Sequence, residues 1–394
     1  MTSAASGSGR DHPIPIAGPS ITDREVQAVA DAARTSWYEH AYDVITEFET
    51  SFARYVDRKF AIALPSCTAG IHLSLAALGI GPGDEVIVPE STWIATSSPI
   101  DLVGGTPSFV DVGTVDWCLD VDACAAAITE RTRAVIVVDL YGGMPRMDEL
   151  IALCGKRGIA LVEDAAEAVG STYRGRRAGS FGAASVFSFH GTKTLTTHEG
   201  GMVLTDDEAL FDRMLRLRDQ GRAPGAAGEF WNLEVGFKYR MSAMQAAMGV
   251  VQLDRVDELV GMKRQIFDWY RARLDGFEGL TLNAEPEGVE SSYWMTTIVL
   301  DEGFGLTKGD VIDALARRGV TARPFFSPLS ALPAYADREG AIDAATRHPV
   351  AYRLGRLGVN LPSALNLVEA DVDAVCRALG DVLGAGPEPA RSKR

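Results

Sequence analysis

Short apolar runs alternate with amphipathic stretches through the first half of the chain. The segments 133–142 and 159–167 are almost continuously apolar until their last residues, as expected of strands buried on both faces of a sheet. The segment between them, 144–158, is amphipathic and ends in two basic residues and Gly158, which is typical of a helix C-terminus. Strands alternating with helices of this length predict βαβ units and a mostly parallel sheet.

The same pattern predicts further elements before residue 200. Additional strands are expected at 61–64, 84–90 and 106–112, and additional helices at 66–80 and 91–105. Beyond residue 200 the pattern changes, and the segment from Ser242 to Leu274 is predicted to form one long helix. The rest mixes short strands with helices, which is typical of a smaller α+β domain.

Both ends of the chain are small, polar and contain proline. We expect the segments 1–14 and 386–394 to be disordered tails. Between them we predict a large domain over 15–260 and a small C-terminal domain over 261–385. The N-terminus lacks the apolar region of a secretory signal, and no apolar run is long enough to span a bilayer, so no membrane partner is expected.

The chain is acidic. Its 394 residues include 38 Lys and Arg against 53 Asp and Glu, giving a formal net charge of −15. Binding to duplex nucleic acid requires a basic surface, so a nucleic-acid partner is not expected. The five cysteines and six histidines are scattered, without a CxxC pair or a Cys/His cluster. This pattern predicts no metal site, and free thiols in a reducing cytoplasm.

Small residues join a predicted strand to a predicted helix at 65–70. Their backbone N–H groups are open, and a helix N-terminus favours an anion such as a phosphate. Thr68 adds a hydroxyl donor. The alternative interpretation is an ordinary helix cap, because Ser and Thr are common capping residues.

Two other segments carry candidate chemistry. Asp164 follows a very apolar strand, where a carboxylate is costly unless it is paired or functional, although it could also cap a helix. Lys193 lies among small hydroxyl residues between two apolar strands, where a desolvated amine can form a Schiff base, although most lysines lie at the surface. Together, a phosphate cradle, a carboxylate for a ring nitrogen and a Schiff-base lysine are what pyridoxal 5′-phosphate requires.

The chain resembles the sugar aminotransferases of the DegT/DnrJ/EryC1/StrS family over roughly residues 15–385. The matching segments are Ser66–Ala69, Gly79–Pro89, Thr92–Thr96, Val162–Ala168, Gly179–Gly182, Phe187–Met202, Gly236–Ala247, Arg323–Ser330 and Asn360–Pro362. The resemblance implies the α/β fold of pyridoxal phosphate-dependent transferases of fold type I. In that fold a large domain with a mostly parallel mixed sheet precedes a smaller α+β C-terminal domain.

The resemblance also implies roles for individual residues. Lys193 matches the lysine that binds the cofactor as a Schiff base and moves the proton during transfer. Asp164 matches the carboxylate paired with the pyridinium nitrogen, and Glu167 matches a position near the cofactor's O3′. Trp93 matches the aromatic residue that stacks on the ring, and the alternative for Trp93 is core packing. Thr68, the amide of Ala69 and Ser188 match the residues that hold the cofactor phosphate.

Other positions are implied near the substrate or the neighbouring subunit. The segment with Lys238 and Arg240 matches one that reaches the neighbouring subunit's site, so a homodimer with shared active sites is expected and either cation could contact the phosphate. For both, the alternative is a solvated charge. His190, His198 and Arg323 are candidate substrate contacts. Relatives often carry Gly at the position of His198 and His at that of Asp139, and both positions are expected near the substrate pocket.

Because Lys193 is present, the resemblance favours transamination over the dehydration that some relatives catalyse with histidine there. The segments 187–197 and 324–330 look most like the perosamine synthase type. We therefore expect transfer of an amino group from L-glutamate to a keto sugar, namely a nucleotide-linked 4-keto-6-deoxy sugar. The alternatives are a keto cyclitol of an aminoglycoside pathway as acceptor, or a non-catalytic sensor with the same fold.

Overall fold

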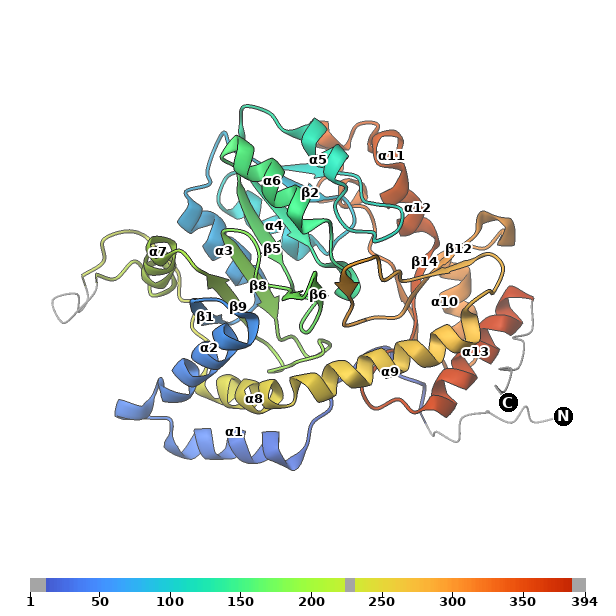
Figure 1. The fold of residues 1–394 in the computed structure, drawn as a ribbon, viewed down its shortest axis with the longest axis horizontal. Coiled ribbons are helices and arrows are strands. Elements are labelled where there is room, and N and C mark those ends of the chain that lie inside the picture. Colours follow the sequence, from blue (N-terminus) through green and yellow to red (C-terminus); the bar gives the residue numbers. More distant parts are fainter. Residues whose placement is uncertain (1–11, 224–230, 385–394) are drawn as a thin grey trace.

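The computed structural model describes residues 12–223 and 231–384, and its first half folds around a seven-stranded sheet (Figure 1). The strands lie in the order β1 (Phe60–Leu64), β9 (Gly201–Thr205), β8 (Ala184–Ser188), β5 (Ala160–Asp164), β4 (Thr132–Val138), β2 (Glu85–Pro89) and β3 (Thr106–Val110). Strand β9 runs antiparallel to both of its neighbours, and all other neighbouring pairs are parallel. This confirms the mostly parallel, mixed sheet.

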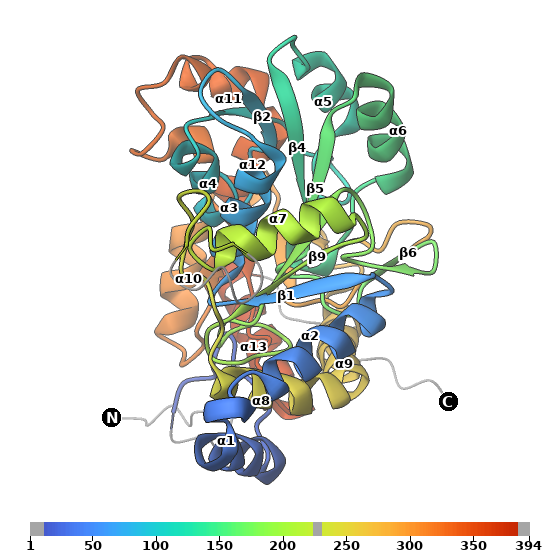
Figure 2. The same cartoon turned by 90° about the vertical axis from the view of Figure 1, so that its left-hand side faces the viewer.

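Helices cover both faces of this sheet (Figure 2). Ala134 and Ile136 of β4 pack in one core with α3 (Cys67–Leu78), whereas Val135 and Val137 pack in another with α6 (Met147–Arg157). Burial on both faces explains why these strands are continuously apolar. The other helices of this half are α1 (Asp23–Thr35), α2 (Asp43–Val56), α4 (Ser98–Leu102), α5 (Val121–Ala127) and α7 (Glu208–Arg218).

The second half of the chain contains a smaller antiparallel sheet. Its strands lie in the order β10 (Leu280–Leu282), β12 (Thr297–Leu300), β14 (Gly358–Asn360) and β13 (Arg323–Pro324). The helices around it are α10 (Lys308–Ala316), α11 (Ala344–Arg347), α12 (Pro349–Leu357) and α13 (Glu369–Leu383). A three-stranded sheet of β11 (Val289–Glu290), β6 (Thr172–Tyr173) and β7 (Arg176–Arg177) joins the two halves of the chain.

The long helix predicted from Ser242 to Leu274 is two helices, α8 (Ala243–Asp254) and α9 (Val256–Leu274). The backbone leaves helical geometry at Arg255, whose buried guanidinium binds Glu25 at 2.6 Å. Helix α8 packs against α1 and α2, whereas α9 packs against α13 (Figure 1). The boundary proposed between residues 260 and 261 therefore falls inside α9.

The predicted helix at 91–105 is also interrupted. It consists of a 3-10 turn at Ile94–Thr96 followed by the short helix α4. Pro99 lies in the first turn of α4, because proline has no N–H to donate and is tolerated there but not in a helix interior. The break leaves the Thr96 hydroxyl free to bond a neighbouring strand.

The prediction of a disordered N-terminal tail is wrong at its end. Ile14 is buried, and its N–H donates to the Gly319 carbonyl at 2.9 Å while its own carbonyl accepts from Thr321 at 3.1 Å. Ile14 and Ile16 belong to the apolar core around the small sheet, because burying them there removes two large apolar side chains from water. Residues 1–11 and the predicted tail 386–394 lie outside the described residues. Within the described ranges, no helix is long and apolar enough to cross a membrane.

Gly201 allows a close approach between β9 and the start of α3. A Cβ atom on Gly201 would lie 2.5 Å from the Ser66 carbonyl carbon and 2.6 Å from the Cys67 nitrogen. Both atoms belong to the backbone, so they cannot move aside as a flexible side chain would. The segment at 65–70 is therefore held in place by the absence of a side chain on β9.

We expect Gly201→Ala to destabilise the protein by about 1–3 kcal/mol or more, because the added methyl group overlaps backbone atoms. The midpoint of urea unfolding measures this loss. Gly155→Ala is the matched control: Gly155 is exposed in α6 with no atom within 4 Å of a built Cβ, so alanine there should stabilise by about 0.5–1 kcal/mol. An unchanged midpoint for Gly201→Ala would contradict the close approach.

Candidate active site

The structure brings the three predicted segments together at the carboxyl ends of the central strands. Asp164 is the last residue of β5, and Cys67, the first residue of α3 after β1, lies with its Sγ 3.6 Å from Asp164 Oδ1. Lys193 lies in the loop between β8 and β9 and is electrostatically coupled to Asp164. Ligands bind at this edge in open α/β sheets.

Asp164 is a buried carboxylate with defined partners. Its Oδ2 accepts a hydrogen bond from the Thr96 hydroxyl at 2.8 Å, and its Oδ1 accepts one from the Ala166 N–H at 3.2 Å. Burial raises the pKa of Asp164, and these hydrogen bonds together with the Lys193 charge oppose that rise. The arrangement suits a carboxylate that pairs with a cationic group placed beside it.

The Lys193 amine lies between a carboxylate and an indole. Its Nζ is 3.2 Å from Glu167 Oε1 and 3.6 Å from the centre of the Trp294 ring. The other Glu167 oxygen accepts from the Tyr141 N–H at 2.8 Å. Burial raises the pKa of Glu167, and the neighbouring Lys193 charge opposes that rise. The amine is thus held by charge on one side and by an aromatic face on the other.

Trp294 is a site residue that the sequence analysis did not identify. It precedes β12, and its Nε1–H donates to the Thr192 carbonyl at 2.7 Å, so the indole is fixed to the residue next to Lys193. The segment around it, Tyr293–Leu300, indicated only a strand. Because the contact joins positions about 100 residues apart, no local spacing could reveal it.

Trp93 is exposed rather than packed in the core. Its side chain is 59% exposed, and the nearest aromatic ring, that of Phe326, lies 6.1 Å away between ring centres. An indole with a free face suits stacking on a planar ligand better than it suits the core-packing alternative.

The predicted phosphate cradle is partly occupied by a helix cap. The Ala69 N–H donates to the Ser66 hydroxyl at 3.1 Å, so the capping alternative accounts for this amide. Ser188 ends β8 opposite Gly201, and its hydroxyl oxygen accepts weakly from the His190 N–H at 3.4 Å. Thr68 lies in the first turn of α3 with part of its surface accessible.

The two cations predicted for the neighbouring subunit both contact Asp219 within the chain. Arg240 Nη2 lies 3.1 Å from Asp219 Oδ2, and the exposed Lys238 Nζ lies 3.9 Å from Oδ1. The Arg240 guanidinium also lies over the Tyr42 ring at 4.6 Å.

The predicted substrate residues are exposed. His190 contacts Thr192 and Glu199, and His198 has the left-handed φ of 69° that glycine would adopt without strain. Arg323 lies on the exposed strand β13.

The Asp139 side chain is fully buried, and its nearness to the substrate pocket stays a prediction. Asp139 directly follows β4, and the alternation along that strand, in which Val137 pairs with Glu163 of β5, puts it on the same face as Glu163, which is also fully buried. Neither Asp139 oxygen has a fixed hydrogen-bond donor among the described residues, whereas Glu163 accepts from the Gly179 and Phe181 N–H groups. A proton shared between the two carboxyls satisfies both, and burial raises both pKa values.

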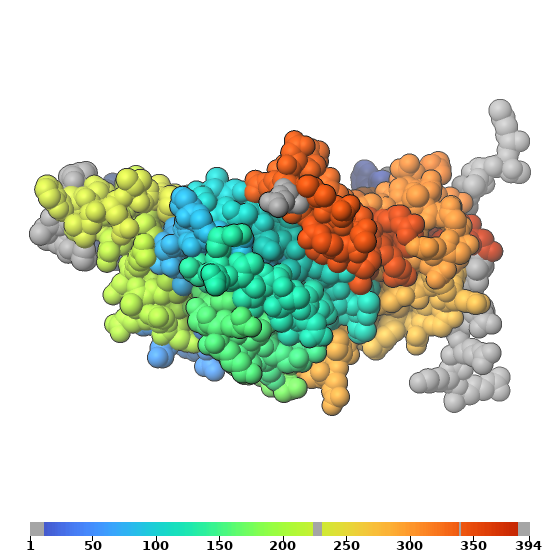
Figure 3. Space-filling view, turned by 90° about the horizontal axis from the view of Figure 1, so that it is seen from above, coloured from blue at the N-terminus to red at the C-terminus, as the bar shows by residue number. Residues whose placement is uncertain are grey.

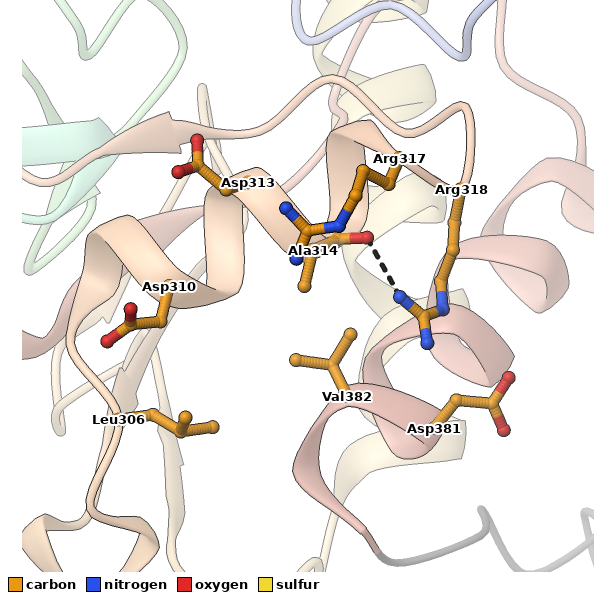
Figure 4. A pocket seen from close by; sticks show the side chains of 8 residues that line it. All are labelled: Leu306, Asp310, Asp313, Ala314, Arg317, Arg318, Asp381 and Val382. Carbon is orange, nitrogen blue, oxygen red and sulfur yellow. Dashed lines mark hydrogen bonds between the residues drawn. The ribbon is translucent and has the colours of Figure 1, made fainter.

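A pocket of about 370 Å³ lies between α10 and α13, and none of the predicted site residues lines it (Figure 4). Its charged lining residues are Asp310, Asp313, Arg317, Arg318 and Asp381. Arg318, just after α10, donates to the Ala314 carbonyl of that helix at 3.0 Å. Within the described residues, no group of three or more His, Cys, Asp or Glu side chains could hold a metal ion.

The fold is that of pyridoxal phosphate-dependent aminotransferases. The chain aligns with Spr1654 of Streptococcus pneumoniae in its PLP-form with a TM-score of 0.86 and 30% identity, over 95% of this chain and 99% of that chain. The aminotransferase TlmJ from Streptoalloteichus hindustanus aligns with a TM-score of 0.86 and 29% identity, over 94% and 99% of the two chains.

The sequence then places the chain within one family of these enzymes. The model of the DegT/DnrJ/EryC1/StrS aminotransferase family matches residues 19–380. The chain is 39% identical to the GDP-perosamine synthase of Caulobacter vibrioides over 94% of this chain and 98% of the relative. It is 35% identical to that of Escherichia coli O157:H7, over 93% and 98%. The chain belongs to the DegT/DnrJ/EryC1/StrS aminotransferase family and is an aminotransferase that uses pyridoxal phosphate.

The buried pair of Asp139 and Glu163 predicts a specific pH dependence. A raised pKa in the folded state means that stability is fully present at low pH and is lost as the pH rises, since the unfolded chain releases the proton first. Relative to Asp139→Asn, whose amide needs no shared proton, the wild-type protein should lose up to about 1.4 kcal/mol per pH unit.

Urea unfolding of both proteins at pH 5, 6.5 and 8 measures the difference. Asp212→Asn, an exposed position on α7, is the control and should show a constant difference from wild type. If Asp139→Asn shows the same constant difference, the two carboxyls do not share a proton.

Proposed function

We propose that this aminotransferase moves the amino group of L-glutamate to a nucleotide-linked 4-keto-6-deoxy sugar. The observation that carries the proposal is the Lys193 amine, which lies against Glu167 and the Trp294 ring and is coupled to the buried Asp164 carboxylate. The similarity to GDP-perosamine synthases along almost the whole chain supports the sugar nucleotide as acceptor. A role in amino-sugar biosynthesis follows from that acceptor.

The residues present fit pyridoxal phosphate. Asp164 offers a buried carboxylate for a ring nitrogen, Trp93 an exposed indole for the ring face, and Lys193 an amine for the aldehyde. Ser188 and Thr68 offer hydroxyl groups near the N-terminus of α3 for the phosphate, where a helix favours an anion. When bound, the cofactor supplies the electron sink that allows the proton on the amino-acid Cα to be removed.

The side chains have distinct tasks in this proposal. Asp164, held by Thr96 and Ala166, keeps its negative charge directed at the ring nitrogen. With the cofactor bound, Lys193 would take the proton from the amino-acid Cα and return it during the transfer. Glu167 contacts the amine directly, so it stabilises the protonated form of Lys193 between these transfers.

Nothing observed in the structure favours the keto cyclitol over the sugar nucleotide. A non-catalytic sensor is the weaker alternative, because this chain keeps the amine, the carboxylate and the aromatic residue that the cofactor chemistry requires. We place the enzyme in a reducing cytoplasm, and the five buried cysteines without a disulfide support this location.

Purified enzyme loaded with pyridoxal phosphate should lose its visible absorbance when L-glutamate is added. It should then transfer the amino group to a GDP-linked 4-keto-6-deoxy sugar, detected by mass spectrometry. Lys193→Ala should lower turnover by at least about a thousandfold, because the proposal assigns to this one amine both the bond to the cofactor and the transfer of the proton.

A free keto cyclitol is the matched second acceptor. Efficient transfer to the cyclitol and none to the sugar nucleotide would overturn the proposed acceptor. Ordinary turnover by Lys193→Ala would overturn the role of the lysine.

We propose further that the enzyme acts as a homodimer. Large apolar side chains are exposed at the start of α2 and in the segment after α7: Trp37, Tyr38, Tyr42, Trp231, Leu233 and Val235. The contact between Arg240 and the Tyr42 ring brings these two regions together. Figure 3 shows the yellow-green part of the chain around α7 at one end of the molecule. Exposed apolar patches of this kind mark protein interfaces.

Light scattering after gel filtration should give twice the 42.2 kDa of the chain. Val235→Asp should shift the protein toward the monomer, because Val235 is 92% exposed in one chain and its substitution leaves the fold unstrained. Val115→Asp, at an exposed position elsewhere, is the control and should leave the mass unchanged. A wild-type protein that stays monomeric at tens of micromolar would contradict the dimer.

A further inference from the structure

Lys263 of α9 is a buried lysine without a counter-charge. Its side chain is almost fully enclosed, with 1% of the residue exposed. The amine donates to the Trp294 carbonyl at 3.0 Å and to the Ser363 carbonyl at a shorter distance. In residues 12–223 and 231–384 it forms no ion pair with a carboxylate. A buried ammonium is costly unless it is paired, so this lysine requires an explanation other than charge pairing.

The same face of α9 holds the chain segment that carries Trp294. Arg264 donates to the Ser291 carbonyl, and the Phe267 ring stacks on Tyr293 with 3.6 Å between ring centres and 6° between planes. Tyr293 has a left-handed φ of 47°, a conformation that a bulky residue adopts only when its surroundings impose it. Lys263 adds a third contact between α9 and this segment, because its amine donates a hydrogen bond to the Trp294 carbonyl.

Trp294 links Lys263 to Lys193, the catalytic lysine proposed above. Its backbone carbonyl is held by Lys263, its Nε1–H by Thr192, and its ring face lies 3.6 Å from Lys193 Nζ. The indole is therefore fixed at both ends between α9 and the lysine loop. A displacement of its backbone would move the ring away from the amine.

We propose that Lys263 is a positioning residue of the transamination site: by holding the Trp294 carbonyl, it keeps the indole face against the Lys193 amine. The inference rests on the proposed role of Lys193. Two carbonyl acceptors match the two N–H groups of a neutral amine. Burial, with a smaller contribution from the Lys193 charge, lowers the pKa of Lys263 to about 7, which agrees with a lysine that works as a neutral donor.

Lys263→Met keeps the length of the side chain and removes both donors. In cofactor-free protein, the rate at which an amine reagent labels Lys193, followed by peptide mass spectrometry, should rise at least about threefold as the indole shifts. In the loaded enzyme, kcat should fall about tenfold or more while the KM for glutamate stays within about twofold, because misplacement of a catalytic group affects chemistry more than binding. Lys263→Gln, whose neutral amide keeps N–H donors, should lower the labelling rate and raise kcat relative to Lys263→Met.

Lys308→Met is the matched control. Lys308 is a partly buried lysine of α10 that also donates to a backbone carbonyl, that of Phe325, at 3.3 Å. Its loss should leave the labelling of Lys193 unchanged. If Lys263→Met lowers only the unfolding temperature and leaves labelling and kcat unchanged, the proposal is overturned.

Trp294→Phe provides the test if Lys263→Met does not fold. It removes the Nε1–H bond to Thr192 and should raise the labelling of Lys193; unchanged labelling would overturn the proposal. The labelling experiment uses no sugar substrate. A wrong acceptor would therefore leave its result intact, whereas a wrong role for Lys193 would appear as unaltered turnover of Lys193→Ala.

Discussion

Three buried carboxyl groups lie close together where β5 ends: those of Glu163, Asp164 and Glu167. Burial raises the pKa of each carboxyl, so their ionisation depends on nearby donors and cations. Backbone N–H groups donate hydrogen bonds to Glu163, and the Thr96 hydroxyl donates one to Asp164. The Lys193 amine forms an ion pair with Glu167. Much of the surrounding structure supplies these partners. The turn that replaces a regular helix before α4 presents Thr96, and the loop after β8 presents Lys193.

The surroundings of the Lys193 amine depend in turn on Trp294 and helix α9, which come about 70 to 100 residues later in the chain. Lys193 is enclosed by Glu167 from the large sheet and by Trp294, whose segment is held by α9. Helix α9 follows α8, which packs on α1 and α2 of the first half, and it packs against α13 of the second. One helix therefore sets the position of an aromatic ring at the site while packing in the core of the smaller sheet.

The local pattern was sufficient for the mostly parallel sheet and for bringing Asp164 and Lys193 to one edge of it, because they end or follow neighbouring strands. The place of Glu167 came from the family resemblance. The local pattern was insufficient where the decisive contact is tertiary. The hydrogen bonds from Lys263 to Trp294 and from Trp294 to Thr192 join residues far apart in the chain, so no sequence periodicity reveals them. Ile14 is held by backbone hydrogen bonds to Gly319 and Thr321, which are equally distant in sequence. The burial of Asp139 beside Glu163 is likewise a tertiary arrangement that the pattern of one strand does not reveal.

Strand β9, which runs antiparallel to both of its neighbours in the seven-stranded sheet, has a consequence for the loop that carries Lys193. Because Ser188 pairs with Gly201, the lysine loop is closed at its base by neighbouring strands, and Phe189 bonds both Gly200 and Thr197 just inside that base. A helical crossover would have left the loop to fluctuate with the packing of a peripheral element. Here the loop leaves the sheet at Ser188 and re-enters it at Gly201, directly opposite, so both ends of the segment that carries Lys193 are tied to the same ladder of backbone hydrogen bonds.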